Sequence, residues 1–139
     1  MLNQLILYFK ATRPQFLSIT LLAFLIGYRT PTSEPIQIGY ASFALLLALL
    51  AHSAANIIND YYDDMNGSDR TNTTRISPFT GGSRFIQDNL LTPHEAKIIG
   101  ITLFILVIIG GLILSYLSTF KLIGVGIVGI ILGWSYSAN

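Results

Sequence analysis

The sequence of 139 residues is 52% hydrophobic and only 11% charged, whereas an ordinary soluble domain carries about 25% charged residues. It contains no cysteine, which excludes disulfides, thiolate metal sites and thiol nucleophiles. The net charge of +1 indicates no particular partner, and we expect no nucleic acid. The composition therefore predicts a protein embedded in a lipid bilayer.

Four apolar segments are long enough, or nearly so, to cross a membrane. A helix needs about 20 mostly apolar residues to span the hydrocarbon core. The second and third segments meet that length, and the first and fourth span only with little tilt or with help from flanking aromatic residues. The expected spans are residues 14–30, 36–58, 97–118 and 120–137. We predict an all-α, polytopic bundle of about four transmembrane helices.

The connection over residues 59–95 is long and polar, and long loops in compact domains are usually functional or disordered. Its apolar residues argue against a disordered linker; they are Phe79, Phe85, Ile86, Leu90 and Leu91. With four spans, the side that holds the N-terminus and this loop carries Lys10, Arg13, Arg70, Arg75, Arg84 and Lys97, against Arg29 and Lys121 on the other. The positive-inside rule then puts the N-terminus and the loop in the cytoplasm.

Acidic residues gather where the second span ends. Asp60, Asp63, Asp64 and Asp69 fall within ten positions. If the helix continues past the span, the polar side chains from His52 to Asp64 share an arc of roughly 140°, at 100° per residue. Polar groups at membrane depth face a bundle interior or a wet cavity, so we expect this stripe to face inward.

An all-oxygen ligand set favours Mg²⁺ or Ca²⁺. A calcium-binding EF-hand loop starting at Asp64 fails, because its sixth position is Asp69 rather than glycine and its twelfth is Arg75 rather than glutamate. Mg²⁺ takes one or two carboxylates and leaves room for phosphate oxygens, and the loop arginines are natural phosphate partners. The competing interpretation is a solvated acidic surface, which is more common in soluble proteins than a metal site.

These residues resemble the UbiA superfamily of intramembrane prenyltransferases. Asn56-x-x-x-Asp60-x-x-x-Asp64 is similar to its first aspartate-rich motif, and Thr12-Arg13-Pro14 and Gly133-Trp134-Ser135-Tyr136-Ser137 are typical of the first and fourth segments. The loop sequence Ser77-Pro78-Phe79-Thr80-Gly81-Gly82-Ser83-Arg84 most resembles that of 1,4-dihydroxy-2-naphthoate polyprenyltransferases.

The resemblance implies Mg²⁺-dependent transfer of a polyprenyl group from its diphosphate to an aromatic acceptor, within the menaquinone pathway. It implies Asn56, Asp60 and Asp64 as catalytic residues, with Asp60, Asp64 and Asp63 as metal ligands. Arg84, Arg75, Arg70 and Arg13 become diphosphate-binding candidates, and Tyr136 and Asn59 candidates for the acceptor pocket. The expected location is a bacterial or archaeal cytoplasmic membrane.

The sequence departs from the superfamily in one large respect. Members have about nine transmembrane helices and a second aspartate motif that opposes the first, whereas no aspartate follows Asp88 here. We expect residues 1–139 to be the N-terminal half of a UbiA-type domain, inactive alone and partnered by the missing C-terminal half.

Three other interpretations stay open. One is a small non-enzymatic membrane scaffold or cation-binding protein. A second is a prenyltransferase of another subfamily, serving ubiquinone, haem O, chlorophyll or archaeal lipid synthesis. The third, a CDP-alcohol phosphotransferase, is disfavoured because its Asp-Gly-x-x-Ala-Arg run is absent.

Overall fold

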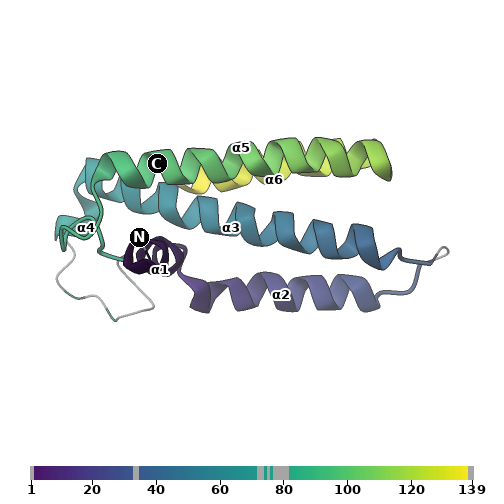
Figure 1. Ribbon diagram of the computed structural model, residues 1–139, viewed down its shortest axis with the longest axis horizontal. Coiled ribbons are helices and arrows are strands. Elements are labelled where there is room, and N and C mark those ends of the chain that lie inside the picture. Colours follow the sequence, from purple (N-terminus) through teal and green to yellow (C-terminus); the bar gives the residue numbers. More distant parts are fainter. Residues whose placement is uncertain (1, 33–34, 72–73, 75, 77–81, 138–139) are drawn as a thin grey trace.

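The chain folds into helices that run side by side along one long axis (Figure 1). A computed structural model describes residues 2–32, 35–71, 74, 76 and 82–137, and these contain helices and no strand. The helices are α1 (Leu2–Ala11), α2 (Pro14–Arg29), α3 (Ile38–Asn66), α4 (Ser68–Thr71), α5 (Pro93–Leu117) and α6 (Lys121–Ser137). The predicted all-α fold is therefore confirmed.

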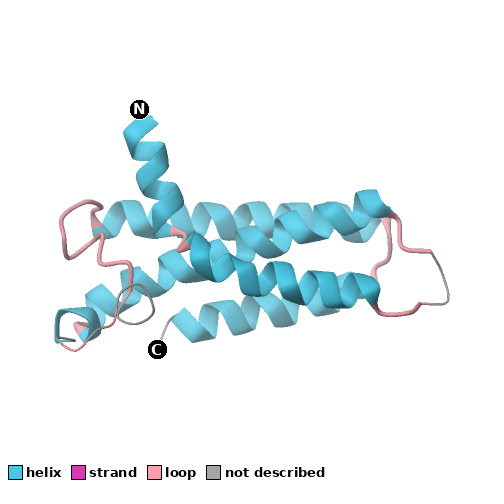
Figure 2. Ribbon diagram, turned by 90° about the horizontal axis from the view of Figure 1, so that it is seen from below, coloured by secondary structure: helices cyan, strands magenta, loops and turns pink. Residues whose placement is uncertain are grey.

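Helix α3 is the centre of the bundle. It packs against α2, α5 and α6, and the four long helices lie roughly parallel to the long axis (Figure 1). Helix α1 is different, because it stands across that axis at the start of α2 (Figure 2). The sequence prediction treated this segment only as a polar lead before the first span and did not assign a helix to it.

The ends of the helices follow from local sequence. At the start of α5 the Thr92 side chain accepts a hydrogen bond from the Glu95 N–H at 3.2 Å, and the Glu95 carboxylate accepts one from the Thr92 N–H at 2.8 Å. This reciprocal pair of hydrogen bonds is a capping box. Helix α3 ends where Gly67 takes the left-handed conformation, with φ of 83°, which glycine adopts without strain.

The predicted boundaries of the polar loop need correction. Residues 59–66 were assigned to the loop 59–95 but are helical, because α3 continues to Asn66; residues 93–95 are likewise helical, as the first turn of α5. No glycine or proline interrupts the sequence between Ile58 and Gly67, so nothing forces the helix to stop where the apolar run stops. The consequence is that Asp60, Asp63 and Asp64 lie on a regular helix, whereas Asp69 follows in the short helix α4.

Helices α3 and α5 approach closely because α5 presents glycines to α3. A Cβ atom on Gly100 would lie 2.5 Å from Cγ1 of Ile58, and one on Gly110 would lie 2.5 Å from a methyl group of Leu47. Ile58 is 1% exposed, so it has little room to move. Small residues at such contacts allow helix backbones to approach in membrane bundles.

Helix α6 is fixed against this pair by aromatic side chains. The Trp134 ring lies 6.1 Å from the ring of Tyr62 on α3 and 6.1 Å from that of Phe104 on α5, measured between centroids. Edge-to-face and tilted ring pairs of this kind are favourable. Trp134 was predicted to be an anchor at the membrane surface, and in the structure it also joins three helices.

Two of the described helices, Ile38–Asn66 and Pro93–Leu117, are long and apolar enough to cross a membrane, by length and composition. Lys121–Tyr136 is a shorter apolar helix, and Pro14–Arg29 has 16 residues. Large apolar side chains are exposed on all of them, for example Ile26 at 72%, Val125 at 70% and Leu132 at 64%. An apolar surface this extensive is typical of contact with lipid or protein.

We expect Gly100→Ala to destabilise the bundle, because the new methyl group overlaps the buried Ile58 side chain. Overpacking of this kind costs about 1–3 kcal/mol. Thermal unfolding of the purified protein in detergent measures the change. Gly111→Ala is the matched control, since nothing lies within 4 Å of its Cβ position and alanine is the better helix former by about 1 kcal/mol. Equal melting temperatures for the two variants would contradict the close contact.

Candidate functional site

The acidic end of α3 turns its polar face into the protein. Asn56, Asp60 and Asp64 occupy successive turns of one helix face and are 8%, 5% and 4% exposed. Asn59 and Asp63 are half-buried beside them, and the Asn59 side chain hydrogen-bonds Asp63. Buried carboxylates are costly unless a partner compensates their charge, so the contacts of these side chains decide what the site can bind.

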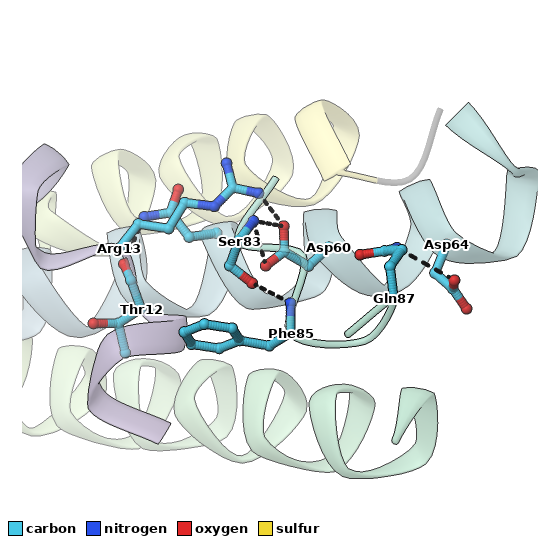
Figure 3. A network of polar contacts seen from close by, with 8 residues as sticks. Thr12, Arg13, Asp60, Asp64, Ser83, Phe85 and Gln87 are labelled. Carbon is cyan, nitrogen blue, oxygen red and sulfur yellow. Dashed lines mark hydrogen bonds and ion pairs between the residues drawn. The ribbon is translucent and has the colours of Figure 1, made fainter. Parts of the chain in front are cut away.

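Asp60 is compensated by Arg13. The Nη2 atom of Arg13 contacts Oδ1 of Asp60 in an ion pair whose side chains are 14% and 7% exposed (Figure 3). The Ser83 N–H adds donated hydrogen bonds to the two carboxylate oxygens, at 3.2 and 3.4 Å. The carboxylate of Asp60 is thus held between the α1–α2 junction and the segment that precedes α5.

Arg13 reaches this position through an unusual backbone. It lies between α1 and α2 with φ of 54° and ψ of 62°, in the left-handed region that non-glycine residues rarely adopt. One residue earlier, the Thr12 carbonyl oxygen accepts a hydrogen bond from the Asn56 side chain at 2.8 Å. Two consecutive residues of the junction therefore bind two consecutive turns of α3.

The segment that precedes α5 covers the other side of the acidic end. Gln87 donates a hydrogen bond to Oδ1 of Asp64 at 3.3 Å (Figure 3). Ile86 and Leu91, in the same segment, are buried at 8% and 5% exposure and pack with Ile57 of α3. The predicted role of apolar residues in ordering this connection is thus visible at Ile86 and Leu91, whereas Leu90 is 52% exposed.

Asp69 is the least satisfied carboxylate of the site. It is 3% exposed, and its Oδ2 atom has no hydrogen-bond partner in the described part of the chain. Arg84 donates to its backbone carbonyl at 3.0 Å rather than to the carboxylate. A buried oxygen without a donor is unusual in native proteins and marks a position where a ligand can add one.

Gly82 brings the two carboxylates to one place. A Cβ atom on Gly82, which has φ of 69°, would overlap Oδ2 of Asp69 and lie 3.0 Å from Oδ1 of Asp60. Both oxygens therefore lie beside the same backbone atom. Only glycine fits this position, because of the space and because of its positive φ.

Electrostatics at this point favour a bound cation. Burial raises the pKa of Asp69 above its ordinary value, and the negative charge of Asp60 raises it further, while Arg13 and Arg84 act in the opposite direction. The charged form of Asp69 is therefore disfavoured as the structure stands. A divalent cation near Asp60 and Asp69 would offset both the cost of burying the Asp69 charge and its repulsion by Asp60.

The donor set suits magnesium. All the candidate ligands are oxygen atoms, and Mg²⁺ commonly binds one or two carboxylates and completes its octahedron with water and phosphate. Within the described ranges, no group of three or more histidine, aspartate or glutamate side chains is arranged to hold a metal ion. Asp60 and Asp69 supply the two carboxylates that such a site needs.

The structure places the other sequence candidates as follows. Arg84 lies at the acidic end, and Tyr136 is 69% exposed on α6. Arg70 belongs to α4, but its side chain, like the whole of Arg75, lies outside the described residues. Sequence reasoning did not select Asp69, Ser83 or Gln87 as site residues; the run Gly67-Ser68-Asp69 was the signal for the first of these.

His52 and Ser53 lie deeper on the same stripe. The His52 Nδ1 atom is 2.8 Å from the Thr20 hydroxyl on α2, and Ser53 donates to the Leu49 carbonyl at 2.8 Å. Both side chains thus have protein partners, and the interpretation of His52 as a hydrogen-bonded interior residue agrees with this contact.

We expect Arg13→Asn to lower the stability of the protein. Asparagine tolerates the left-handed backbone, so the change isolates the loss of the guanidinium from Asp60. Removing one partner of a buried pair costs about 3 kcal/mol or more, which a drop in melting temperature in detergent will show. Arg29→Asn, at an exposed arginine that ends α2, is the control, and an equally small effect of both changes would refute the role of the pair.

Asp69→Asn should raise stability at neutral pH without divalent cations. The pKa of Asp69 is raised in the folded state, so the folded protein loses stability as pH rises through that pKa. Asparagine has no such titration, and its advantage should shrink as pH falls toward the ordinary aspartate pKa of 3.8, where the unfolded state also begins to bind the proton. Melting temperatures of the two proteins at pH 7 and pH 4, with a chelator present, test this; a variant that is less stable at both values would contradict it.

A comparison with protein families gives one match that covers most of the chain. The model of the UbiA prenyltransferase family matches residues 16–138, from the first turns of α2 through the whole acidic end and α6. No curated protein matches the chain, and no solved structure does. The chain therefore belongs to the UbiA prenyltransferase family, whose members are integral membrane proteins.

Proposed function

We propose that this chain forms the diphosphate-binding side of a Mg²⁺-dependent transferase that moves a polyprenyl group from its diphosphate to an aromatic acceptor, in menaquinone synthesis. Prenyl transfer is the general activity of the family. The observation that carries the proposal is the pair of buried carboxylates, Asp60 and Asp69, whose oxygens both lie beside Gly82. Two arginines lie at the same place, in contact with these two residues.

The arrangement matches the chemistry of a diphosphate leaving group. Mg²⁺, when bound, supplies Lewis-acid stabilisation of the negative charge that develops on the diphosphate. Asp60 and Asp69 would hold the ion, and the guanidinium groups of Arg13 and Arg84 are suited to bind phosphate oxygens in bidentate fashion. Electrostatic stabilisation of a developing charge is commonly the largest single contribution to such a reaction.

All the bond changes of the reaction take place in the donor and the acceptor, and no protein group needs to form a covalent intermediate. The allylic C–O bond breaks and the diphosphate leaves with the electron pair, while an aromatic carbon of the acceptor attacks the allylic carbon. The ring then loses the proton from the carbon that was attacked. The apolar prenyl chain requires a lipid-accessible surface, which the exposed apolar side chains of α2 and α6 provide.

Asp60 and Asp69 supply acidic groups on one side of the proposed diphosphate site. Beyond Asp88 the only acidic residue is Glu95, and its carboxylate is occupied in the cap of α5. We therefore propose that turnover requires a second acidic group from outside this sequence, and that the chain by itself binds Mg²⁺ and diphosphate but transfers prenyl groups slowly or not at all.

Binding is the sharpest test, because it does not depend on turnover. Calorimetry in detergent should detect binding of geranyl thiolodiphosphate, a non-reactive donor analogue, only when Mg²⁺ is present. Asp69→Asn should weaken this binding by about tenfold or more, the loss of a charge-assisted contact, while leaving the Arg13–Asp60 pair intact. Asp88→Asn, which changes an exposed aspartate of the same connection, should bind as the unchanged protein does.

Two results would overturn the proposal. Analogue binding that persists in a chelator would show that no metal takes part. Binding of Mg²⁺ without any binding of the analogue would favour the cation-binding alternative. The acceptor is tested separately, by asking whether 1,4-dihydroxy-2-naphthoate or 4-hydroxybenzoate binds to the Mg²⁺-analogue complex; preference for the benzoate would contradict the menaquinone assignment alone.

A further inference from the structure

Helix α1 has two apolar faces, and only one of them packs against other residues that the structure describes. Leu7, Tyr8 and Ala11 pack against the hydrophobic cluster around Ile57. On the other side Leu5, Ile6 and Phe9 are 58%, 46% and 60% exposed. At 100° per residue these three side chains share an arc of about 100°, so the exposed face, defined by these three residues, is continuous along the helix.

The level of α1 along the bundle follows from the residues that it touches. Its packed face contacts the cluster that contains Ile57 of α3 and Ala96 and Ile99 of α5. The apolar part of α3, from Ile38 to Ile57, rises about 30 Å at 1.5 Å per residue, which is the thickness of the hydrocarbon core of a bilayer. Helix α1 therefore lies where the apolar part of the bundle ends and the acidic end begins.

The direction of α1 fits the same level. Helix α1 stands across the long axis of the bundle (Figure 2), and that axis crosses the membrane in a chain whose long apolar helices span it. A helix perpendicular to the spans lies parallel to the membrane plane. Polar Asn3 and Lys10 are exposed at the edge of the apolar face, as expected where a helix borders on lipid headgroups.

The exposed face of α1 also continues the exposed apolar surface of α2. Two residues separate the end of α1 from Pro14, where α2 begins. The outer side chains of α2, Ile19, Leu22 and Ile26, are 62%, 59% and 72% exposed. We propose that α1 is a membrane-surface helix, which inserts the face formed by Leu5, Ile6 and Phe9 into the boundary between headgroups and acyl chains on the side of the acidic site. This inference rests on the membrane location of the family and not on the proposed substrates.

The absence of cysteine from the chain allows a clean test by site-directed spin labelling. The variants Leu5→Cys and Phe9→Cys place a nitroxide on the exposed face, and Asn3→Cys and Lys10→Cys place one at its polar edge. Leu7→Cys provides a reference for a packed position. Each full chain is reconstituted in vesicles of phosphatidylethanolamine and phosphatidylglycerol at three to one, and collisions with oxygen and with a water-soluble nickel chelate are measured.

Labels at Leu5 and Phe9 should collide often with oxygen and rarely with nickel, whereas labels at Asn3 and Lys10 should show the opposite. Nickel collisions at Leu5 and Phe9 equal to those at Asn3 would overturn the proposal, because the face would then be in water. Few collisions with either reagent, as at Leu7, would overturn it in favour of a protein partner or a second copy of this chain.

A separate measurement on the same proteins checks that each labelled variant is folded. Circular dichroism should show the same helix content in all five variants, since four of the altered side chains are exposed. If the Leu5 or Phe9 variant fails this check, it is replaced by Ile6→Cys, which lies on the same face. The result is therefore read only from folded protein.

Discussion

The burial of acidic charge at the end of a membrane helix is the constraint on which the rest of this structure depends. Asp60, Asp64 and Asp69 are almost entirely removed from solvent, and an uncompensated carboxylate there would cost several kcal/mol. The α1–α2 junction supplies a guanidinium, and the segment before α5 supplies backbone and side-chain donors. Both connections have unusual conformations that bring these groups to the carboxylates. Arg13 has a positive φ, and the Gly82 backbone closely approaches Asp60 and Asp69.

The compensation is incomplete at one atom, and that incompleteness is informative. Arg13 neutralises Asp60, but Oδ2 of Asp69 lies beside the same glycine with no donor among the described residues. If stability alone mattered, a neutral residue would serve better than Asp69. The raised pKa of Asp69 means that its ionisation lowers the free energy of unfolding, and a neutral side chain avoids that loss. A site that binds a cation needs the opposite, namely carboxylates whose mutual repulsion is relieved only when the ion is present.

Periodicity was sufficient to predict the fold class and the inward face of α3. Apolar runs and the positions of His52, Asn56, Asp60 and Asp64 depend on local sequence alone, and the burial of these residues agrees with the predicted stripe. The end of α3 was placed too early, since a loss of hydrophobicity was taken for a loss of helix. Helix α1 was missed because it carries apolar residues on two faces and therefore has no simple polar side.

The choice of partners within the site required the tertiary structure. Arg13 was predicted as a diphosphate-binding residue and not as the partner of Asp60, because the two lie 47 residues apart and no spacing rule relates positions so far apart. The same applies to Gly82, whose role is visible only when the oxygens of Asp60 and Asp69 are seen beside the same backbone atom. Composition located the acidic cluster, but it could not say which of the aspartates would be neutralised by the protein itself.

The sequence order of the ion pair has a consequence for biosynthesis. Arg13 precedes α2, and Asp60 follows the apolar part of α3, so the cation leaves the ribosome before its carboxylate does. The pair is formed by the α1–α2 junction and α3 alone, so the acidic end of α3 needs no helix later in the sequence to receive its counterion.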